Sequence, residues 1–511
     1  MKILFIGRHF TYFRNFDAAI RELARRGHQL HLAVEVEEKT PNGARAVETL
    51  AKETPGVTYG MVPGRRADQW SSIALRLRLG LDYLRYLDPF YDTAPLRRIR
   101  ARTRTPRLLA ALATPPLVGG PRWRRWLGRR LHALDAAVPP PQTIIDFLRD
   151  QRPDVMLITP LVDLGSQQID YVRAARLLKI PTGLAVWSWD HLTSKAYLRE
   201  YPERVFVWND TQRGEAIDIH GVPPDRVVVT GAQCFDHWFD RTPSRTREEF
   251  CRLHGFPVDK PIVLYVGGAF VQGIAPEPPF IEEWIAWMRG SGDPALEGAS
   301  VLLRPHPQQT AGWHEVDWRQ YGHVAVWGSS PVDQRSRDDY FDSLFHSAAV
   351  VGINTSAFIE AGIVGRDVLA ILVPRFHDTQ QGTEHFRYLM QIGGGLLRIS
   401  SDRETHLRQL GEALRRPPST EHPHRTFLEA FVRPAGLGRS ATPEFVAAVE
   451  AMEGIRVDDP VRAAAPWRRA VFGGLVRAAS AIAGDRLIRS PRELDPARQA
   501  AIAAAEREKT R

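Results

Sequence analysis

The residues best suited to chemistry lie between 350 and 368, where an apolar strand is followed by a short polar turn and a helix. The turn consists of Asn354, Thr355 and Ser356. Such residues favour the start of a helix, whose free N–H groups and positive dipole end attract an anion such as a phosphate. Glu360 follows Ser356 by about one turn on the same face, where a carboxylate can accept hydrogen bonds from ribose hydroxyls. The alternative is an ordinary capped helix that carries a surface glutamate.

A second set of candidate phosphate contacts follows two other expected strands. Arg304 and His306 come directly after the strand expected at 300–303, and prolines on both sides of His306 stiffen the backbone. Open α/β sheets bind ligands at the carboxyl ends of their strands, so we expect Arg304 to clamp a phosphate and His306 to hydrogen-bond one. The alternative is an exposed loop with a solvated histidine. Gly267 and Gly268, also after a strand, either let the backbone approach the ligand or form a tight turn.

A mixture of aromatic and polar side chains follows an expected strand in the first half of the chain. It comprises Trp187, Trp189, Asp190, His191 and Lys195. Such mixtures suit carbohydrate-like or lipid-phosphate acceptor substrates, and Asp190 or His191 is the expected general base, a role worth about 10²–10⁴-fold in rate. The alternative is an interdomain loop in which Asp190 caps a helix. Arg8, His9 and Arg14 follow the first strand and are expected to bind the acceptor substrate or the donor's phosphates.

Alternating strands and helices are expected to position these residues. In the first half, strands are expected at 2–7, 29–34, 154–159, 182–187, 205–208 and 227–229, with helices at 16–26 and 170–178. In the second half, strands are expected at 261–266, 300–303, 324–327, 348–353 and 368–372, with a helix at 281–289. A chain of 511 residues exceeds the size of one hydrophobic core. The sequence therefore predicts two doubly wound α/β domains, at 1–232 and 233–455.

The positive charge of the chain is concentrated in an insert at about 70–145 and in the tail. The net charge is +9, and residues 93–134 contain eleven arginines but no Asp or Glu. Trp123, Trp126 and several leucines are interleaved with these arginines, which suits an acidic lipid surface or a lipid-linked acceptor. The tail at 456–511 has the pattern of a basic amphipathic helix, which either packs across the domains or attaches to a membrane surface.

Several classes of protein are disfavoured by the composition. The two cysteines, Cys234 and Cys251, cannot form a disulfide framework or a four-ligand zinc site. The loop after the first strand lacks the Gly-x-Gly-x-x-Gly pattern of dinucleotide-dependent dehydrogenases. No fold signature supports nucleic-acid binding. Neither a signal-peptide core nor 18 uninterrupted apolar residues occur, so we expect a cytoplasmic protein, with peripheral attachment to the inner face of the membrane as a further expectation.

Together these features resemble bacterial glycosyltransferases of the GT-B fold, over roughly residues 1–450. The resemblance rests on the paired α/β domains, the hinge at 230–236, the turn from Arg304 to Pro307 and the helix that carries Glu360. Within that fold the chain looks most like enzymes of surface-polysaccharide assembly and CDP-glycerol glycerophosphotransferases, while UDP-N-acetylglucosamine 2-epimerases share the same frame.

The resemblance implies a metal-independent transferase without a cofactor. Its second domain would hold a nucleotide-sugar or CDP-polyol donor, with Asn354, Thr355, Ser356 and His306 near the phosphates and Glu360 at the ribose. The first domain would bind a glycan or lipid-linked acceptor. A sugar-nucleotide 2-epimerase remains an alternative on the same fold. A non-catalytic basic module that binds anionic polymer or membrane is an alternative of another class.

Overall fold

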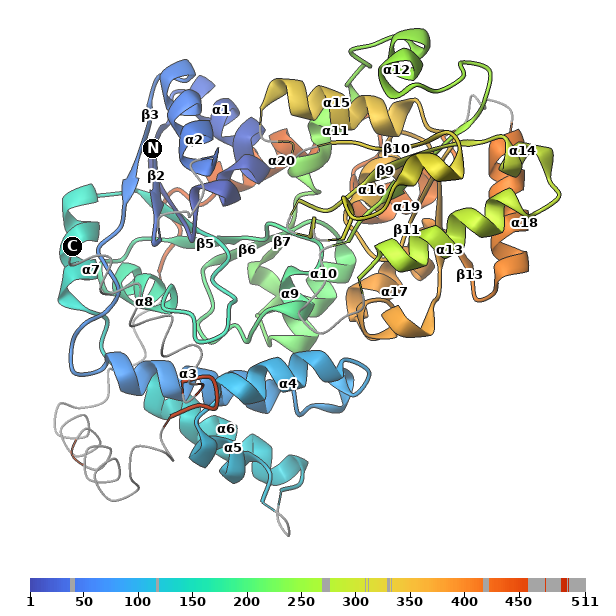
Figure 1. The fold of residues 1–511 in the computed structure, drawn as a ribbon. Helices are drawn as coiled ribbons and strands as arrows, with labels where there is room; N and C mark the ends of the chain where they lie inside the picture. The colour runs from blue at the N-terminus through green and yellow to red at the C-terminus, as the bar shows by residue number, and fades with distance from the viewer. Residues whose placement is uncertain are drawn as a thin grey trace, which may run out of the picture.

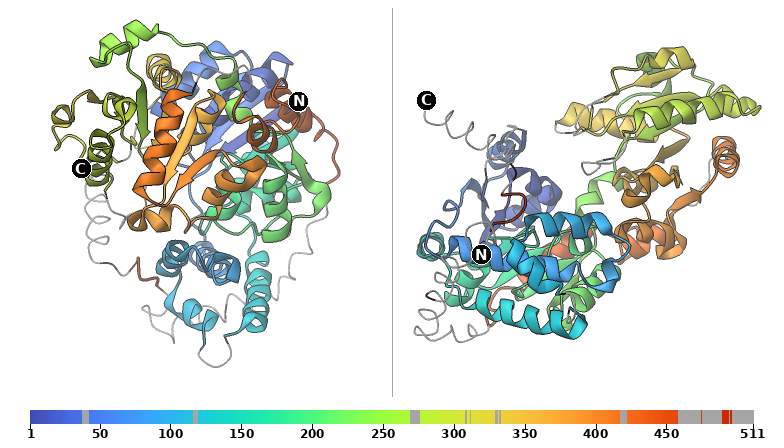
Figure 2. Two further views of the ribbon diagram at one scale, coloured as in Figure 1. Left: turned by 90° about the vertical axis from the view of Figure 1, so that its right-hand side faces the viewer. Right: turned by 60° about the horizontal axis from the view of Figure 1, so that its bottom comes forward.

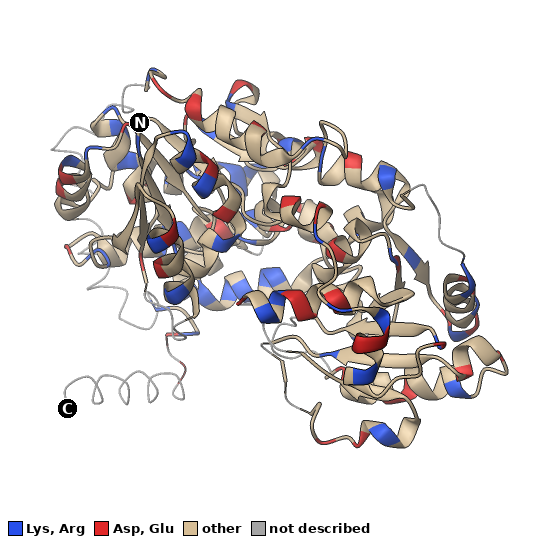
Figure 3. Cartoon of the chain, turned by 90° about the horizontal axis from the view of Figure 1, so that it is seen from above, with Lys and Arg blue, Asp and Glu red and all other residues tan. Residues whose placement is uncertain are grey.

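The computed structural model describes residues 1–457 except 37–41, 116–118, 269–275, 308, 311, 329–330, 332 and 417–421, together with residues 474, 489–493 and 495. Two α/β domains lie side by side, and a helical insert lies against the first of them (Figure 1). Basic and acidic side chains are interspersed over both domains (Figure 3).

The first domain is built on a parallel sheet of seven strands in the order β3-β2-β1-β4-β5-β6-β7. The strands are β1 (Lys2–Gly7), β2 (Gln29–Val34), β3 (Val57–Met61), β4 (Val155–Ile158), β5 (Thr182–Ala185), β6 (Arg204–Val207) and β7 (Val227–Val229). The helices on its two faces are η1 (Phe10–Phe16), α1 (Asp17–Arg25), α2 (Asn42–Glu53), α7 (Gln142–Gln151), α8 (Ile169–Leu177), α9 (His191–Ser194), α10 (Asp210–Gly214) and the π-helix η3 (Glu215–Ile219). Strand order reverses between β1 and β4, which makes that position the topological switch point.

The second domain has a parallel sheet of six strands in the order β10-β9-β8-β11-β12-β13. The strands are β8 (Ile262–Val266), β9 (Ser300–Arg304), β10 (Val324–Val326), β11 (Ala349–Gly352), β12 (Asp367–Ile371) and β13 (Leu397–Ser400). Its helices include α11 (Asp236–Phe239), α12 (Arg247–His254), α13 (Pro278–Arg289), α14 (Pro294–Glu297), α15 (Gln334–Phe345), α16 (Ala357–Ile363), α17 (Glu384–Gln391), α18 (Arg403–Arg415) and α19 (Arg425–Phe431). Here the order reverses between β8 and β11. Both sheets therefore confirm the predicted pair of doubly wound domains.

The last described helix, α20 (Ala441–Glu450), returns to the first domain. Phe445 is buried against Phe16 and Phe206, with ring centroids 5.9 Å and 5.4 Å away. The start of the helix is held by Asp236, whose carboxylate accepts hydrogen bonds from the Thr442 N–H at 2.7 Å and from the Ala441 N–H at 3.0 Å. Residues 441–457, which the prediction included in the second domain of 233–455, thus pack against the first sheet. Sequence order alone could not reveal this crossing.

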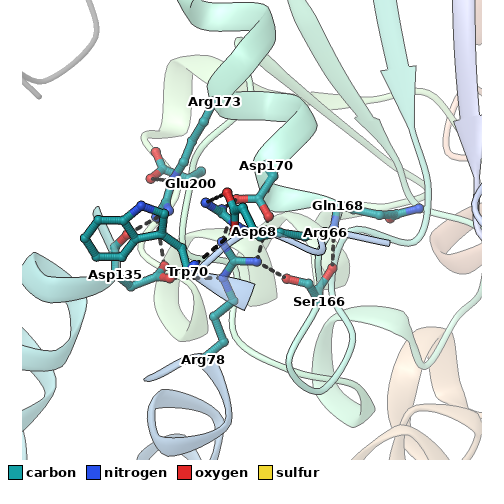
Figure 4. A network of polar contacts seen from close by, with 10 residues as sticks. All are labelled: Arg66, Asp68, Trp70, Arg78, Asp135, Ser166, Gln168, Asp170, Arg173 and Glu200. Carbon is teal, nitrogen blue, oxygen red and sulfur yellow. Dashed lines mark hydrogen bonds and ion pairs between the residues drawn. The ribbon is translucent and has the colours of Figure 1, made fainter. Parts of the chain in front are cut away.

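The basic insert consists of four helices with a hydrophobic cluster of their own. They are α3 (Ser71–Arg85), α4 (Pro95–Arg104), α5 (Arg107–Ala113) and α6 (Pro121–Ala136). They form a separate layer against the first domain (Figure 2). A buried ion network holds the layer in place: the Arg78 guanidinium lies 2.7 Å from Asp170 of α8 and 3.0 Å from Asp135 of α6 (Figure 4).

The predicted amphipathic helix of the tail, at 456–511, lies almost entirely outside the described residues. Within the part of the chain that the structure describes, none of the helices combines the length and the apolar character that crossing a membrane requires.

Candidate functional site

The predicted ligand-binding residues gather at the carboxyl ends of the strands that flank the two switch points. Arg8 and His9 follow β1, Gly267 follows β8, and Asn354 follows β11 after one intervening residue. In doubly wound sheets, ligands bind in the crevice outside these strand ends. The topology therefore brings the predicted donor residues to one edge of the second sheet.

The glycine turn after β8 lies close to the turn after β9. The Gly267 N–H donates to the Arg304 carbonyl at 2.9 Å, and a Cβ at Gly267 would lie only 2.8 Å from the backbone nitrogen of His306. Glu277, which precedes α13, supports this turn by accepting from the Gly268 N–H at 3.2 Å and from the Tyr265 hydroxyl at 2.9 Å. Burial raises the pKa of Glu277 to about 8, although both donors oppose the shift. Glycine is required at 267 because two strand ends meet there.

The polar turn before α16 uses its side chains differently from the prediction. The Asn354 amide donates to the Thr379 carbonyl, and Thr355 Oγ1 accepts weakly from the Ala357 N–H at 3.4 Å. Ser356 is exposed and makes no capping hydrogen bond with its side chain. The turn thus leaves the Ser356 hydroxyl at the surface of the site, while Asn354 ties the turn to the segment after β12.

Glu360 lies on α16 and faces the first domain. It accepts a hydrogen bond from the Tyr340 hydroxyl, and burial raises the pKa of Glu360 to about 7 against the opposing effects of Tyr340 and Arg14. Burial lowers the pKa of His306, and the Arg14 guanidinium, from η1 of the first domain, lowers it further. Arg14 is therefore close enough to His306 and Glu360 for its charge to act on both, although more than 290 residues separate Arg14 from His306 in sequence.

Arg304 does not occupy the predicted position of a phosphate clamp. Its guanidinium is buried and donates to the Asp339 carboxylate at 2.9 Å and to the Ser343 hydroxyl at 2.8 Å, both on α15. It also lies 5.2 Å from the centre of the Tyr340 ring. A guanidinium committed in this way stabilises the wall of the site, so the interpretation of Arg304 as a donor contact is corrected to a supporting role.

On the first domain, η1 packs against the aromatic loop after β5. The Tyr12 and Trp187 rings lie 4.7 Å apart edge to face, and the Asn15 amide donates to the Trp187 carbonyl at 3.1 Å. Arg8 forms an ion pair with Asp163, and the His9 imidazole contacts the Val36 carbonyl. The loop that follows β1 and the loop that follows β5 thus form one continuous surface, as the prediction of a common acceptor site requires.

Asp190 lies at the centre of a polar loop next to the second domain. Its carboxylate accepts from the hydroxyls of Ser188 and Ser194, both at 2.6 Å, and lies 3.1 Å from the Lys195 ammonium. Burial alone would raise the pKa of Asp190, but Lys195, His385 and the two hydroxyls together hold it well below its ordinary value. Asp190 is therefore ionised at neutral pH.

His191 has a structural role instead of the predicted catalytic one. The side chain is fully buried, Nε2 contacts the Pro160 carbonyl at 2.7 Å, and Nδ1 accepts from the Trp187 N–H at 3.4 Å. Burial lowers the pKa of His191 to about 4. Because backbone groups occupy both ring nitrogens, the interpretation of His191 as a base is corrected. Trp189 is likewise buried and packs edge to face on His385 of α17, 4.7 Å away.

Sequence reasoning missed three side chains of the cleft. Tyr340 donates a hydrogen bond to Glu360, and Glu277 accepts one from the Gly268 N–H. Glu35 follows β2 and is close enough to Arg8 for that charge to lower its pKa. Burial raises the pKa of Glu35 to about 7, with Arg8 the largest opposing influence. Glu35 could have been found, because it directly follows a predicted strand that neighbours β1. Tyr340 and Glu277 carry no comparable signal, since Tyr340 lies within α15 and Glu277 directly precedes α13.

No protein-family model matches this chain, and no curated protein matches it. Solved structures do resemble it. The UDP-GlcNAc 2-epimerase of Neisseria meningitidis, bound to UDP-GlcNAc, has a TM-score of 0.50 and 11% identity, covering 88% of this chain and 100% of that one. The UDP-GlcNAc 2-epimerase of Methanocaldococcus jannaschii has a TM-score of 0.50 and 10% identity, covering 88% and 99%. A glycosyltransferase from Rickettsia africae has a TM-score of 0.49 and 8% identity, covering 88% and 98%.

Identities near 10% establish the fold alone. This chain is similar to the two epimerases in having two Rossmann-like domains, each with a parallel sheet and flanking helices, over nearly the whole length of those proteins. The fold predicted from the sequence, an α/β protein of the GT-B arrangement, is thereby confirmed.

Proposed function

We propose that this protein is an enzyme that transfers a sugar or a polyol phosphate from a nucleotide-activated donor to a cell-surface glycan or a lipid-linked acceptor. One observation carries the proposal: Arg14 of the first domain lies within electrostatic range of His306 and Glu360, which follow strands of the second sheet at their carboxyl ends. A phosphate-bearing ligand in this position would contact both domains. The UDP-GlcNAc held by the N. meningitidis protein of similar fold supports a nucleotide sugar as the ligand class.

In this proposal the donor's phosphates lie between the Gly267–Gly268 turn and the turn that ends at Ser356. Backbone N–H groups and the Arg14 guanidinium would stabilise the negative charge that develops on the departing nucleotide, a role that fixed donors and cations perform in the absence of solvent. Glu360 would accept hydrogen bonds from the ribose hydroxyls. Because Tyr340 already donates to Glu360, the carboxylate is held in place before the ligand arrives.

Asp190 is the proposed general base. A low pKa makes it a weak base, but it also keeps the carboxylate ionised and ready to accept a hydrogen bond from the hydroxyl of the acceptor substrate. That hydroxyl becomes more acidic as its bond to the transferred group forms, so the proton can move late in the reaction. Trp187, Tyr12 and Lys195 would line the surface on which the acceptor substrate lies.

The exposed side of the insert supports a lipid-linked acceptor over a free one. Leu108, Leu112 and Trp126 are about two-fifths exposed, at 38%, 40% and 41%, and basic residues flank them on the same helices. Exposed apolar and basic side chains together favour the surface of an acidic membrane. Peripheral attachment through this surface would place the cleft near such an acceptor.

A sugar-nucleotide 2-epimerase is the second candidate, because the proteins of similar fold include two UDP-GlcNAc 2-epimerases. The two activities separate in one assay. An epimerase converts UDP-N-acetylglucosamine without any other substrate, whereas a transferase leaves the sugar configuration unchanged until an acceptor is added. Proton magnetic resonance of the sugar follows both.

Thermal unfolding with added nucleotides tests the proposal. At millimolar concentration, one of UDP, CDP, GDP, TDP or CMP should stabilise the protein by about 2.7 kcal/mol if its dissociation constant is about a hundredfold lower than its concentration. The Arg14→Met variant should lose most of this stabilisation, while Arg25→Met, at an exposed position in α1, should keep it. No stabilisation of the wild-type protein by any of the five nucleotides would refute the proposal.

A further inference from the structure

Buried polar side chains, three of which carry atoms without a hydrogen-bond partner among the described residues, gather where the insert, the first domain and the second domain meet. We call this set the junction cluster. It consists of Arg85 of α3, Arg97 of α4, Glu215 of η3, and His385 and Tyr388 of α17. The five residues come from three separate parts of the chain, and the Asp190 loop lies beside them.

The two arginines each use only part of their guanidinium. Arg85 donates from Nε to the Tyr91 hydroxyl at 2.7 Å and from Nη2 to the Leu192 carbonyl at 2.6 Å, and Arg97 Nη2 contacts His385 Nδ1 at 3.0 Å. The Nη1 atoms of both arginines are buried and have no partner among the described residues. A buried donor without a partner is costly, and a guanidinium more so, which points to a ligand that the structure does not include.

Glu215 also has buried polar atoms without a partner among the described residues, in this case its two carboxyl oxygens. It opens the π-helix η3, its side chain is 4% exposed, and neither carboxyl oxygen has a hydrogen-bond partner of normal geometry among the described residues. Isolated π-helical turns occur frequently at functional sites. Burial raises the pKa of Glu215 to about 8, while Tyr388, Arg85 and Arg97 oppose the shift. The group is therefore mostly protonated at neutral pH and able to donate a hydrogen bond.

The charges around the cluster leave an excess of positive charge. Arg85, Arg97 and Lys195 are cations, and Asp190 is paired with Lys195. Burial lowers the pKa of His385 to about 3, so its ring is neutral and its Nδ1 accepts from Arg97. The nearby carboxylates have other partners: Glu384 accepts from Thr93 and pairs with Arg387, and Asp82 pairs with Arg199.

We propose that the junction cluster binds an oxyanion, a phosphate or carboxylate group carried by the acceptor substrate, with Arg85 and Arg97 as donors and Glu215 completing the site. The assignment to the acceptor substrate rests on the proposed function; the oxyanion site itself does not. Two guanidinium groups with free N–H bonds match the several acceptor oxygens of such an anion. The insert would then contribute directly to recognition, since Arg97 of α4 contacts His385 of α17 in the second domain.

Sulfate is a suitable probe because it keeps the charge of a phosphate dianion throughout the pH range of interest. Sulfate binding to the full chain would be measured by titration calorimetry for the wild-type protein and for Arg97→Met and Arg100→Met. Arg100 lies on the same helix and is exposed, so its loss removes the same charge without touching the cluster. We expect Arg97→Met to weaken sulfate binding about tenfold or more, since a charge-assisted hydrogen bond is lost, and Arg100→Met to leave it nearly unchanged.

Glu215→Gln provides a second, independent test. In the wild-type protein sulfate binding should weaken between about pH 7 and about pH 9, because Glu215 loses its proton and then repels the anion. The glutamine stays neutral and should largely remove this dependence. Tyr91, Tyr86 and Tyr388 face the cluster with raised pKa values and stay protonated in this range, and Lys195 and the two arginines are unchanged by the substitution.

Two further probes, inorganic phosphate and soluble dihexanoyl phosphatidic acid, separate a free anion from a lipid-borne one. Tighter binding of the lipid, with the same loss in Arg97→Met, would identify a lipid-borne phosphate. Equal sulfate affinities of folded Arg97→Met and Arg100→Met would overturn the site, as would a pH dependence that survives in Glu215→Gln. If the site binds sulfate as expected but no nucleotide stabilises the protein, the proposed function fails and the anion site stands.

Discussion

Neighbouring groups determine whether each polar side chain of the candidate site is available to bind a ligand. Arg304 ends the apolar strand β9, and Arg14 lies in the helix that follows the apolar strand β1. Arg304 is buried against Asp339, whereas Arg14 is exposed and close enough to Glu360 to lower its pKa. The sequence predicted that Arg304 binds a phosphate and that Arg14 binds either the acceptor substrate or the donor's phosphates. It could not distinguish them, because the residues that decide the outcome lie on helices far away in the chain. Asp190 and His191 also differ in the partners that the fold gives them. Backbone groups contact both ring nitrogens of His191, whereas the Asp190 carboxylate contacts side chains.

Glu360 provides a prediction with a defined sign in pH. Glu360→Gln should weaken nucleotide binding about tenfold, because a neutral amide accepts a hydrogen bond from ribose less strongly than a carboxylate does. With a pKa of about 7, wild-type Glu360 gains a proton as the pH falls from about 8 to about 6, so nucleotide affinity should fall with it. Titration calorimetry at both pH values measures the two effects. Glu429→Gln, on α19, is the control, and a wild-type affinity that rises in acid would contradict the role of Glu360.

Asp190 should matter for turnover and not for donor binding. Asp190→Asn keeps the shape of the side chain but removes its charge, and we expect turnover to fall by about 10²–10⁴-fold. The same variant should retain nucleotide-induced thermal stabilisation, because Asp190 lies on the first domain. Full activity in Asp190→Asn would exclude the residue as the base.

At the scale of elements, the strands that are buried on both faces of a sheet are the ones that the sequence predicts best. β4 and β8 are buried along their whole length and read as continuous apolar runs, so both were predicted with nearly correct ends. The edge strands β3 and β13 were missed. β3 is exposed at Thr58, Tyr59 and Met61, and β13 is largely half-buried, so neither presents an apolar run. Their pairing with β2 and β12 supplies the order that local sequence lacks.

Helix α20 yields a test of the connection between the two domains. Phe445→Ala should destabilise the protein by about 3–5 kcal/mol, since it removes a buried ring that contacts Phe16 and Phe206. Urea-induced unfolding followed by circular dichroism measures the change. Phe345→Ala, at a position that is 36% exposed, should cost clearly less. Equal losses in the two variants would show that α20 does not stabilise the first domain as described.

At the scale of the whole molecule, the sequence indicated two domains and a basic insert but not how these parts meet. The insert's arginines suggested an acidic lipid surface or a lipid-linked acceptor as their partner, yet Arg97 contacts His385 of the second domain and Arg124 donates to the Leu87 carbonyl at 2.8 Å within the insert. Likewise, Arg14 was assigned to the acceptor side or to the donor's phosphates without a choice between them. Contacts between segments that are hundreds of residues apart leave no periodic signal, and only the folded arrangement reveals them.

A crystal structure with the most stabilising of the five nucleotides tests the central claim most directly. The account predicts that the phosphates lie between Gly267 and Ser356, with the ribose on Glu360 and the Arg14 guanidinium within hydrogen-bonding distance of a phosphate oxygen. A nucleotide bound instead at the carboxyl ends of β1 and β4, or side chains that fill the space beside Glu360 and His306, would contradict it.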